Sequence, residues 1–286
     1  MAINYTTLIT DDELLPLLGN EDLVIIDCTY YLNDFDRGRR EYLKAHIPGA
    51  YFLDIGNDLS APVIKGVTGR HPLPNPDVIT AAFKACGVNT NSQVIVYDQM
   101  NGVYASRAWW LLQWLGHKQA AILNGGFVSW IAAGHETDNQ WPPPKKGNFI
   151  SNPRNELVVS KEEIGKIENT TVDSREYKRY TGETEPIDPI AGHIPGAVCI
   201  PYMDNVDDLG IWKSNEFLAE KFKDVTDPSN PPVFYCGSGV TACHNIFGYK
   251  LATGLDAKLY AGSWSEWINY YPIALGPNPN GNGQNN

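Results

Sequence analysis

The sequence contains no long apolar run and no closely spaced pair of cysteines. Its longest apolar stretches, at 23–26 and 108–112, are far shorter than the ~20 residues that a helix needs to cross a bilayer. Its 5 cysteines are spread over 286 residues without a CxxC pair, which is typical of free thiols rather than of a disulfide framework or a zinc site. We therefore expect no membrane partner, no metal ion and a reducing compartment, the cytoplasm.

Positive charge is scarce as well. Lys and Arg number 22 against 33 Asp and Glu, which gives a net charge of −11. A protein that follows a nucleic acid backbone carries a basic face, so we expect no nucleic acid partner. The N-terminal residues also lack the basic start and apolar centre of a signal peptide. In such an acidic chain, a small anionic substrate requires a local positive site.

An internal repeat organises the chain. The segment HIPGA occurs at 46–50 and again at 193–197. The residues around both copies also correspond: VIIDCT matches TVDSR, VIVYD matches PVFYC, and LNGGFVSW matches LYAGSWSEW. The sequence therefore predicts a tandem duplication. Its hydrophobic content of 43% is enough for each half to bury a core of its own.

Strands and helices are predicted to alternate. Short β-branched or aromatic runs stand at 24–26, 94–97 and 233–235, and helical patterns at 106–115 and 241–251. This alternation is typical of βαβ units and predicts an α/β fold with buried parallel sheets. Proline and tail composition then set the predicted boundaries: a first domain at 1–137, a linker at 138–155, a second domain at 156–275 and a disordered tail at 276–286.

The two halves differ at the residue that ends one predicted strand. That residue is Asp98 in the first half and Cys236 in the second. Ligands of parallel α/β sheets bind beyond the carboxyl ends of the strands, and Gly237 and Gly239 permit a loop whose N–H groups turn toward the sulfur. Such a nest favours a thiolate over a thiol. We expect Cys236 to be a nucleophile, and a buried apolar cysteine is the alternative.

The segment CGSGVTAC, with GHIPGA before it and a Gly-Trp segment after it, resembles the tandem-domain rhodanese family of sulfurtransferases. The resemblance spans about 8–273 and implies two tandem rhodanese-like domains, each a mostly parallel sheet flanked by helices, with an inactive first domain. It also implies that Cys236 carries a persulfide from a small anionic donor to an acceptor, namely a thiol, cyanide or thioredoxin, without a cofactor. The neutral loop is more similar to the 3-mercaptopyruvate branch than to the thiosulfate branch.

Two other functions are compatible with a cysteine at the end of a strand in this kind of fold. Cys-based phosphatases use a related fold, but they need an arginine that closes the loop to hold the phosphoryl oxygens. This chain has Ala242 at that place, which argues against a phosphatase. A non-catalytic module that senses sulfur or binds a partner through the same tandem fold is the remaining alternative.

The resemblance also implies which residues bind the substrate. Arg179 matches the substrate-binding arginine of the family's second domain and suits a planar carboxylate or sulfonate. The mercaptopyruvate branch has a second arginine shortly after it, whereas this chain reads EPID at 185–188. Ser238 matches a residue assigned to sulfur or substrate activation, with helix capping as the alternative. The loop residues expected to contact substrate are Gly237, Gly239, Val240 and Thr241.

A catalytic histidine is expected at His46, with Asp36 ten residues before it as a relay partner, because the resemblance implies a relay there. His193 holds the same position in the second HIPGA segment, so a turn-stabilising role for His46 is an equal alternative. Arg175 is expected to form an internal salt bridge with Asp173.

Several other reactive residues are given structural roles. Cys243 and His244 lack the spacing of a metal site and are expected to pack in a helix. Trp264 and Trp267 are expected to pack in the core. Arg70 and His71 are assigned to a surface turn of the first domain, with contact to an interdomain cleft as the alternative, and Lys178 is expected to be solvated. The sequence thus assigns the chemistry to the second half.

Overall fold

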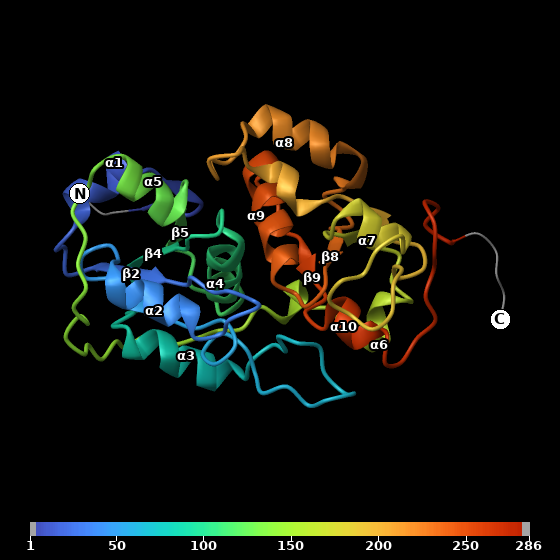
Figure 1. The fold of residues 1–286 in the computed structure, drawn as a ribbon, viewed down its shortest axis with the longest axis horizontal. Helices are drawn as coiled ribbons and strands as arrows, with labels where there is room; N and C mark the ends of the chain where they lie inside the picture. Colours follow the sequence, from blue (N-terminus) through green and yellow to red (C-terminus); the bar gives the residue numbers. More distant parts are fainter. Residues whose placement is uncertain (1–3, 282–286) are drawn as a thin grey trace. The chain divides into compact units, whose positions relative to one another are not determined.

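The computed structural model describes residues 4–281, which form two compact units (Figure 1). The first unit comprises the described residues up to Ala61, Pro74–Arg154 and Val206–Trp212. The second comprises Pro62–Leu73, Asn155–Asn205 and the described residues from Lys213 onward. The second unit therefore includes Pro62–Leu73, which the boundaries predicted from sequence assign to the first domain.

The first unit contains a five-stranded parallel sheet in the order β1-β5-β4-β2-β3. The strands span Leu8–Ile9 (β1), Leu23–Asp27 (β2), Tyr51–Phe52 (β3), Gln93–Tyr97 (β4) and Ala120–Leu123 (β5). Strands β2 and β4 are buried along their whole length, as continuous runs of β-branched residues predict for a sheet that is covered on both faces.

The second unit contains a four-stranded parallel sheet in the order β7-β6-β8-β9. Its strands span Thr171–Asp173 (β6), Val198–Cys199 (β7), Val233–Tyr235 (β8) and Lys258–Leu259 (β9). This order repeats β3-β2-β4-β5 of the first unit, and a parallel bridge between Val158 and Leu259 stands where β1 pairs with β5. The predicted α/β fold with two parallel sheets is confirmed.

Helices flank both sheets. In the first unit they span Asp11–Leu14 (α1), Arg37–Lys44 (α2), Pro76–Ala85 (α3), Val103–Trp114 (α4) and Gly126–Ala132 (α5). In the second they span Lys161–Ile164 (α6), Tyr177–Thr181 (α7), Asn215–Phe222 (α8), Thr241–Thr253 (α9) and Ser263–Trp267 (α10). Short 3-10 turns occur at Leu15–Leu17, Asn155–Leu157, Tyr202–Asn205 and Lys223–Val225. In the first unit, α1 and α5 lie on one side of the sheet and α3 on the other (Figure 1).

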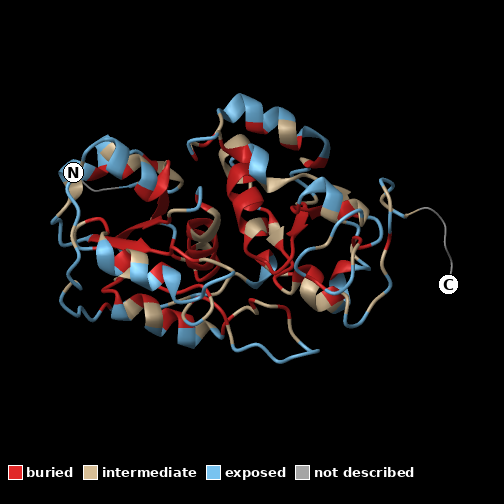
Figure 2. Ribbon diagram, in the orientation of Figure 1, coloured by how far each residue is buried: buried red, intermediate tan, exposed pale blue. Residues whose placement is uncertain are grey.

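One apolar core cluster of each unit is formed by its strands with α1 and α5, or with α6 and α10, and the helix that follows β4 or β8 packs against the sheet separately. Those helices, α4 and α9, are buried along most of their length (Figure 2), because apolar and small residues occupy all their faces rather than one stripe. Trp264 and Trp267 belong to the core of the second unit, as predicted. Within the described residues, no helix has both the length and the apolar character that crossing a membrane requires.

The segments predicted as linker and tail make specific contacts. Within the first unit, Asp138 exchanges backbone hydrogen bonds with His46, and the N–H groups of Gly147 and Arg154 donate to the carbonyls of Lys84 and Trp114. Residues 276–281 are hydrogen-bonded to the second unit: the Gly276 N–H donates to the Thr181 carbonyl, and the Pro279 carbonyl accepts from the Gly196 N–H. The structure thus differs from the predicted disordered tail at 276–281, while 282–286 lie outside the described residues.

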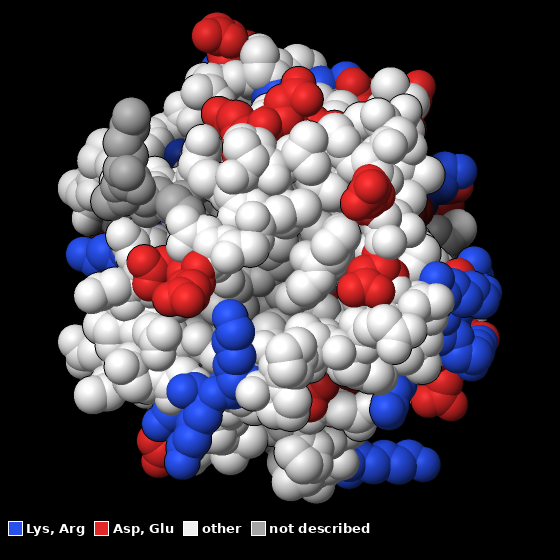
Figure 3. Space-filling model, turned by 90° about the vertical axis from the view of Figure 1, so that its left-hand side faces the viewer, with Lys and Arg blue, Asp and Glu red and all other residues white. Residues whose placement is uncertain are grey.

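The charged side chains on one face of the molecule are drawn in Figure 3. On that face, acidic and basic side chains stand in separate small groups with wide uncharged areas between them. The negative net charge of the chain is therefore not gathered into one patch on this face.

Candidate active site

Cys236 directly follows β8 and precedes α9 in the second unit. The loop between them curls so that the Gly239 N–H donates a hydrogen bond to the Cys236 Sγ at 3.1 Å. Gly239 has a φ of +78°, and a Cβ there would collide with the carbonyl oxygen of Ala261, so this turn requires glycine. Cys236 is 1% exposed, and its sulfur lies at the N-terminal end of a 13-residue helix, where backbone N–H groups favour negative charge.

The first turn of α10 holds the backbone of the nucleophile in place. The Ser263 Oγ accepts a hydrogen bond from the Cys236 N–H at 3.1 Å, and the N–H of Trp264 donates to the Cys236 carbonyl at 2.9 Å. Ser263 has a φ of +54°, which is unusual for a residue other than glycine. The sequence analysis missed Ser263. The repeat could have indicated this residue, because Gly126 stands at the matching position of the first half. Gly126 also has a left-handed φ, of +58°.

The corresponding loop of the first unit holds a carboxylate instead of a sulfur. The Asp98 carboxylate accepts hydrogen bonds of 2.7–2.9 Å from the N–H groups of Met100, Gly102, Tyr104 and Ala105. Burial raises the pKa of Asp98, and these four hydrogen bonds act in the opposite direction. The loop that the two halves share is therefore a nest for an anion, as the glycine pattern predicts.

Arg179 projects from α7 and is 12% exposed. Its Nε and Nη2 bind the Glu185 carboxylate at 2.7–3.1 Å, and its Nη2 also lies 3.2 Å from the Asp188 Oδ2. Burial raises the pKa of Glu185, but the hydrogen bonds and charge of Arg179, together with the N–H groups of Asp188 and Ile187, hold that pKa below its ordinary value. A Cβ on Gly237 would lie 3.6 Å from the Arg179 Nη2. The structure thus places Arg179 beside the Cys236 loop, with one edge of its guanidinium already occupied.

Arg70 and His71 reach the same loop, so the surface-turn assignment is wrong. The Arg70 Nη1 is paired with the Asp188 Oδ1, and its backbone N–H donates to the Ser265 Oγ at 3.1 Å. His71 is 5% exposed. Both residues come from Pro62–Leu73, which folds as part of the second unit. This placement could not be predicted, because the segment lies far from the Cys236 loop in the sequence.

His71 lies beside the second residue of the loop. Its Nδ1 is 2.8 Å from the Ser238 Oγ, and both side chains are buried. A hydroxyl group that is hydrogen-bonded to an imidazole nitrogen can transfer a proton to it. The pair stands two residues from Cys236. The sequence analysis named Ser238 but did not give His71 a chemical role.

His46 occupies a different environment in the first unit. Its Nδ1 faces the Tyr42 carbonyl at 2.7 Å and its Nε2 faces the Gln140 carbonyl at 3.1 Å. His193 repeats this pattern against the carbonyls of Tyr180 and Pro279. Asp36 is exposed at the start of α2. Backbone carbonyls thus face both ring nitrogens of His46, as a turn-stabilising role requires. A catalytic role for His46 stays a prediction.

Arg175 forms the internal salt bridge that the sequence predicts. Its Nη2 lies 2.6 Å from the Asp173 Oδ2, and neither side chain is exposed. Its guanidinium carbon also lies 4.7 Å from the centre of a Trp264 ring, a cation–π distance. Cys243 is buried in α9, and its Sγ donates to the Gly239 carbonyl at 3.3 Å. Cys243 therefore contacts the Cys236 loop directly, whereas Arg175 links β6 to Trp264 of α10.

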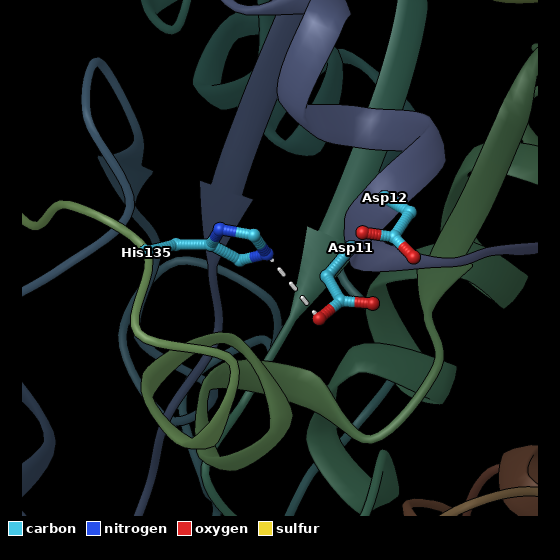
Figure 4. A group of neighbouring side chains, drawn as sticks. All are labelled: Asp11, Asp12 and His135. Atoms are coloured by element: carbon cyan, nitrogen blue, oxygen red, sulfur yellow. Dashed lines mark ion pairs between the residues drawn. The ribbon is translucent and has the colours of Figure 1, made fainter.

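A group that could hold a metal ion occurs in the first unit, among the described residues. Asp11, Asp12 and His135 offer ligand atoms within 4.8 Å of one another (Figure 4). The His135 Nε2 is paired with the Asp11 Oδ2 at 3.4 Å, and its ring packs on Trp130 with 4.5 Å between centroids. Both acids stand in the first turn of α1, where negative charge is favoured without any ion. We assign no metal to this group.

Comparisons with known proteins agree with this geometry. The Rhodanese-like domain family matches residues 10–133 and 159–270. The chain is 44% identical to the "Probable 3-mercaptopyruvate sulfurtransferase" of Pseudomonas aeruginosa, over 94% of this chain and 98% of that protein. It is 36% identical to the "Putative thiosulfate sulfurtransferase SseB" of Mycobacterium tuberculosis, over 93% and 95% of the two chains.

Solved structures give the same result. The 3-mercaptopyruvate sulfurtransferase from Leishmania major superposes with a TM-score of 0.84 at 30% identity, covering 93% of this chain and 75% of that one. SseA from Escherichia coli, described as a 3-mercaptopyruvate sulfotransferase, superposes with a TM-score of 0.78 at 30% identity, covering 92% and 100%. Two tandem α/β units, one of which carries a cysteine loop after a parallel strand, are typical of tandem-domain sulfurtransferases. The chain belongs to the rhodanese family, and the resemblance stated from its motifs is confirmed.

Proposed function

We propose that this chain is a sulfurtransferase that carries one sulfur atom on Cys236 from a small anionic donor, 3-mercaptopyruvate or thiosulfate, to a nucleophilic acceptor. The observation that carries the proposal is the nest around Cys236, whose Sγ accepts the Gly239 N–H at 3.1 Å. The first unit holds Asp98 at the same place, so only the second unit has a sulfur there.

In the first step, the Cys236 thiolate attacks the outer sulfur of the donor. With thiosulfate, the S–S bond of the donor breaks, its electron pair leaves with sulfite, and Cys236 becomes a persulfide. With mercaptopyruvate, the C–S bond breaks, the electron pair passes to the enolate of pyruvate, and the proton of the donor thiol ends on that carbon. Each donor thus delivers a neutral sulfur atom, and neither route needs a cofactor.

The loop is suited to hold the persulfide that results. The terminal sulfur of a persulfide stands two bonds beyond Cβ, as the carboxylate oxygens do in Asp98. The Asp98 oxygens bind the N–H groups of Tyr104 and Ala105, which correspond in the repeat to Thr241 and Ala242. These two N–H groups belong to the first turn of α9, which has no intrahelical acceptor for them. We expect them to bind the terminal sulfur.

The pair formed by Ser238 and His71 provides a path for the proton of mercaptopyruvate. The Ser238 hydroxyl is two residues from the nucleophile and 2.8 Å from the His71 Nδ1. It can therefore accept the thiol proton of the donor and return it to the enolate carbon through the imidazole. Thiosulfate carries no proton, so its reaction does not need this pair.

In the second step, an acceptor thiolate or cyanide attacks the terminal sulfur and restores the Cys236 thiolate. Small thiols, cyanide and thioredoxin are the acceptors that we propose. All 5 cysteines are free thiols in the described structure, which supports a reducing compartment such as the cytoplasm. Gly237 and Val240, which complete the loop, are proposed to contact the donor through their backbone.

The test replaces the two cysteines of the CGSGVTAC segment separately. Cys236→Ser should abolish sulfur transfer from both donors to cyanide while keeping the thermal unfolding temperature, because a hydroxyl at this site is a poor sulfur nucleophile. Cys243→Ser is the matched control, since that thiol points to the Gly239 carbonyl, and it should retain turnover. A wild-type protein without turnover on either donor would favour the non-catalytic sulfur-sensing module.

A further inference from the structure

The first unit has a hollow of its own beside α3, made of residues that the proposed sulfur transfer does not use. Its volume is about 460 Å³, which suits a small organic molecule better than a single ion. We call it the α3 hollow. It is lined by one face of α3 and by one residue of the segment after α5, namely Asp77, Thr80, Ala81, Lys84, Ala85 and Lys146. All of these residues belong to the first unit.

The face of α3 that lines the hollow is fixed by the rest of the helix. Its residues stand at positions i, i+3, i+4, i+7 and i+8 from Asp77, so they share one side of the helix. The Asn75 side chain caps the helix start by accepting the Asp77 N–H at 2.8 Å. Ile79 and Phe83 of the same helix are fully buried in the unit. The hollow therefore has a rigid wall.

Backbone hydrogen bonds place Lys146 beside the C-terminal end of this wall. The Gly147 N–H donates to the Lys84 carbonyl at 2.8 Å, and the Phe149 N–H donates to the Val88 carbonyl at 3.1 Å. A Cβ on Gly147 would collide with the Val88 carbonyl oxygen, so this close approach requires glycine. The backbone on which Lys146 stands is thus positioned before any ligand binds.

The two lysines make the hollow a local positive site in an acidic chain. The chain has 33 acidic residues, yet within residues 4–281 no carboxylate pairs with the Nζ of Lys84 or of Lys146. Lys84 stands in the last turn of α3, where the helix dipole favours a cation. Lys146 belongs to no helix and has no such partner. An anion bound in the hollow would be attracted by both charges.

Thr80 adds a buried hydroxyl group to the same wall. Its side chain is 8% exposed, and its Oγ1 has no hydrogen-bond partner among the described residues. A buried hydroxyl without a partner costs free energy. Thr80 stands one helical turn before Lys84, on the same face of α3, so an anion held by Lys84 would lie close to a hydroxyl that can donate to it.

We propose that the α3 hollow binds an organic phosphate monoester, with its phosphate group at Lys84, Lys146 and Thr80. Two lysines balance the two negative charges that such a phosphate carries. Lysine binds phosphate as a point charge, whereas the planar fork of arginine is the better match for a carboxylate. This site is independent of the proposed sulfur transfer, because no residue of the Cys236 loop takes part in it.

The remaining residues of the hollow suit the organic part of the ligand. Ala81 and Ala85 present methyl groups along the middle of the wall. Asp77 stands two helical turns before Lys84, which is about 10 Å along the axis. Its carboxylate can accept hydrogen bonds from hydroxyl or amino groups at the far end of the ligand. We therefore expect a phosphate monoester of a sugar or nucleoside to bind more tightly than inorganic phosphate.

The first experiment measures binding to the full chain by titration calorimetry. The probes are glucose 6-phosphate and adenosine 5′-monophosphate, with inorganic phosphate, glucose and adenosine as controls. We expect at least one monoester to bind more tightly than inorganic phosphate, and the two uncharged controls not to bind. If neither monoester binds more tightly than inorganic phosphate, the proposal is overturned.

Lysine variants then locate the bound phosphate. Lys84→Met and Lys146→Met should each weaken binding of the monoester about tenfold, the order expected for a lost hydrogen bond to a charged group. Lys145→Met is the matched control, since it removes the same charge from the exposed neighbour of Lys146 that does not line the hollow, and it should keep the wild-type affinity. Wild-type affinity in both Lys84→Met and Lys146→Met would place the ligand elsewhere and overturn the proposal.

Thr80→Val separates ligand binding from stability. Valine keeps the shape of threonine and removes the hydroxyl without a partner, so the thermal unfolding temperature of the free protein should stay equal or rise. Binding of the monoester should weaken about fivefold, because the ligand loses one hydrogen bond. An unchanged affinity would overturn the role of Thr80. Sulfur transfer by all these variants should equal that of the wild type, which keeps this test separate from that of the proposed function.

Discussion

At the scale of single residues, the duplication lets the chain be compared with itself. A buried aspartate ends the second strand of the first unit at Asp27 and the matching strand of the second at Asp173. Asp173 is paired with Arg175, but the first half has Thr29 at the position of that arginine. Burial therefore raises the pKa of Asp27 to about 7. The same fold tolerates a buried acid with a cation or without one.

Asp27 makes stability depend on pH. Because its pKa is raised in the folded protein, the folded state holds the proton more tightly, and stability falls as pH rises from about 4 toward about 7. A shift of this size corresponds to roughly 4 kcal/mol. Asp27→Asn removes the cost of ionising this buried carboxyl group, so the variant should gain stability relative to wild type above pH 7. Urea unfolding of both proteins at pH 5 and pH 8 measures the difference in their free energies of unfolding. The same difference at both pH values would contradict the raised pKa of Asp27.

The pair of His71 and Ser238 predicts an effect that depends on the donor. His71→Asn should lower kcat/KM for mercaptopyruvate by about 10²-fold, the usual size of a lost proton transfer, and should change the thiosulfate reaction far less. Ser238→Ala should have a similar effect, and the double variant should be no worse than either single one. Steady-state rates with both donors measure this, and equal losses on both donors would show that His71 serves only to hold the loop.

At the scale of elements, the site depends on how the first turn of α10 meets the loop after β8. Ser263 adopts a left-handed φ and accepts the buried N–H of Cys236. The first unit uses Gly126 there and has no hydroxyl. A serine at this φ costs of order 1 kcal/mol of strain, which the bond to Cys236 offsets.

Two substitutions at Ser263 separate strain from hydrogen bonding. Ser263→Ala keeps the strained φ and leaves the Cys236 N–H without its acceptor, so we expect a loss of about 1–3 kcal/mol in the free energy of unfolding. Ser263→Gly relieves the strain and loses the same bond, so its loss should be smaller. Chemical denaturation measures both variants. The reverse order would show that the hydroxyl does not support the loop.

Much of this element-level picture could be predicted from the sequence. The strand that leads to the site is a short run of β-branched and aromatic residues, and the repeat indicates which strand end carries the nucleophile, so Cys236 and its glycines could be placed. Arg70 and His71 could not, because the bond from His71 to Ser238 spans 167 residues and the segment around it has no periodic pattern. Arg179 could be located, but its pairing with Glu185 depends on side-chain packing that a motif does not specify.

At the scale of the whole molecule, the duplication yields two loops of similar backbone that hold different chemical groups. The first holds the Asp98 carboxylate with four N–H donors, and the second holds the Cys236 sulfur with donors left for a further atom. The acidic net charge of −11 opposes anionic donors at long range. We therefore expect donor capture to depend on local positive charge in the second unit rather than on the overall field.

We propose that Cys236, alone among the 5 cysteines, accepts sulfur from the donor. The most direct test treats the wild-type protein with mercaptopyruvate or thiosulfate in the absence of acceptor, blocks the thiols, and maps added mass on each cysteine peptide. The account predicts the mass of one additional sulfur atom on the Cys236 peptide and its disappearance after cyanide is added. Sulfur on Cys28, Cys86, Cys199 or Cys243 instead, or on no cysteine with either donor, would contradict it.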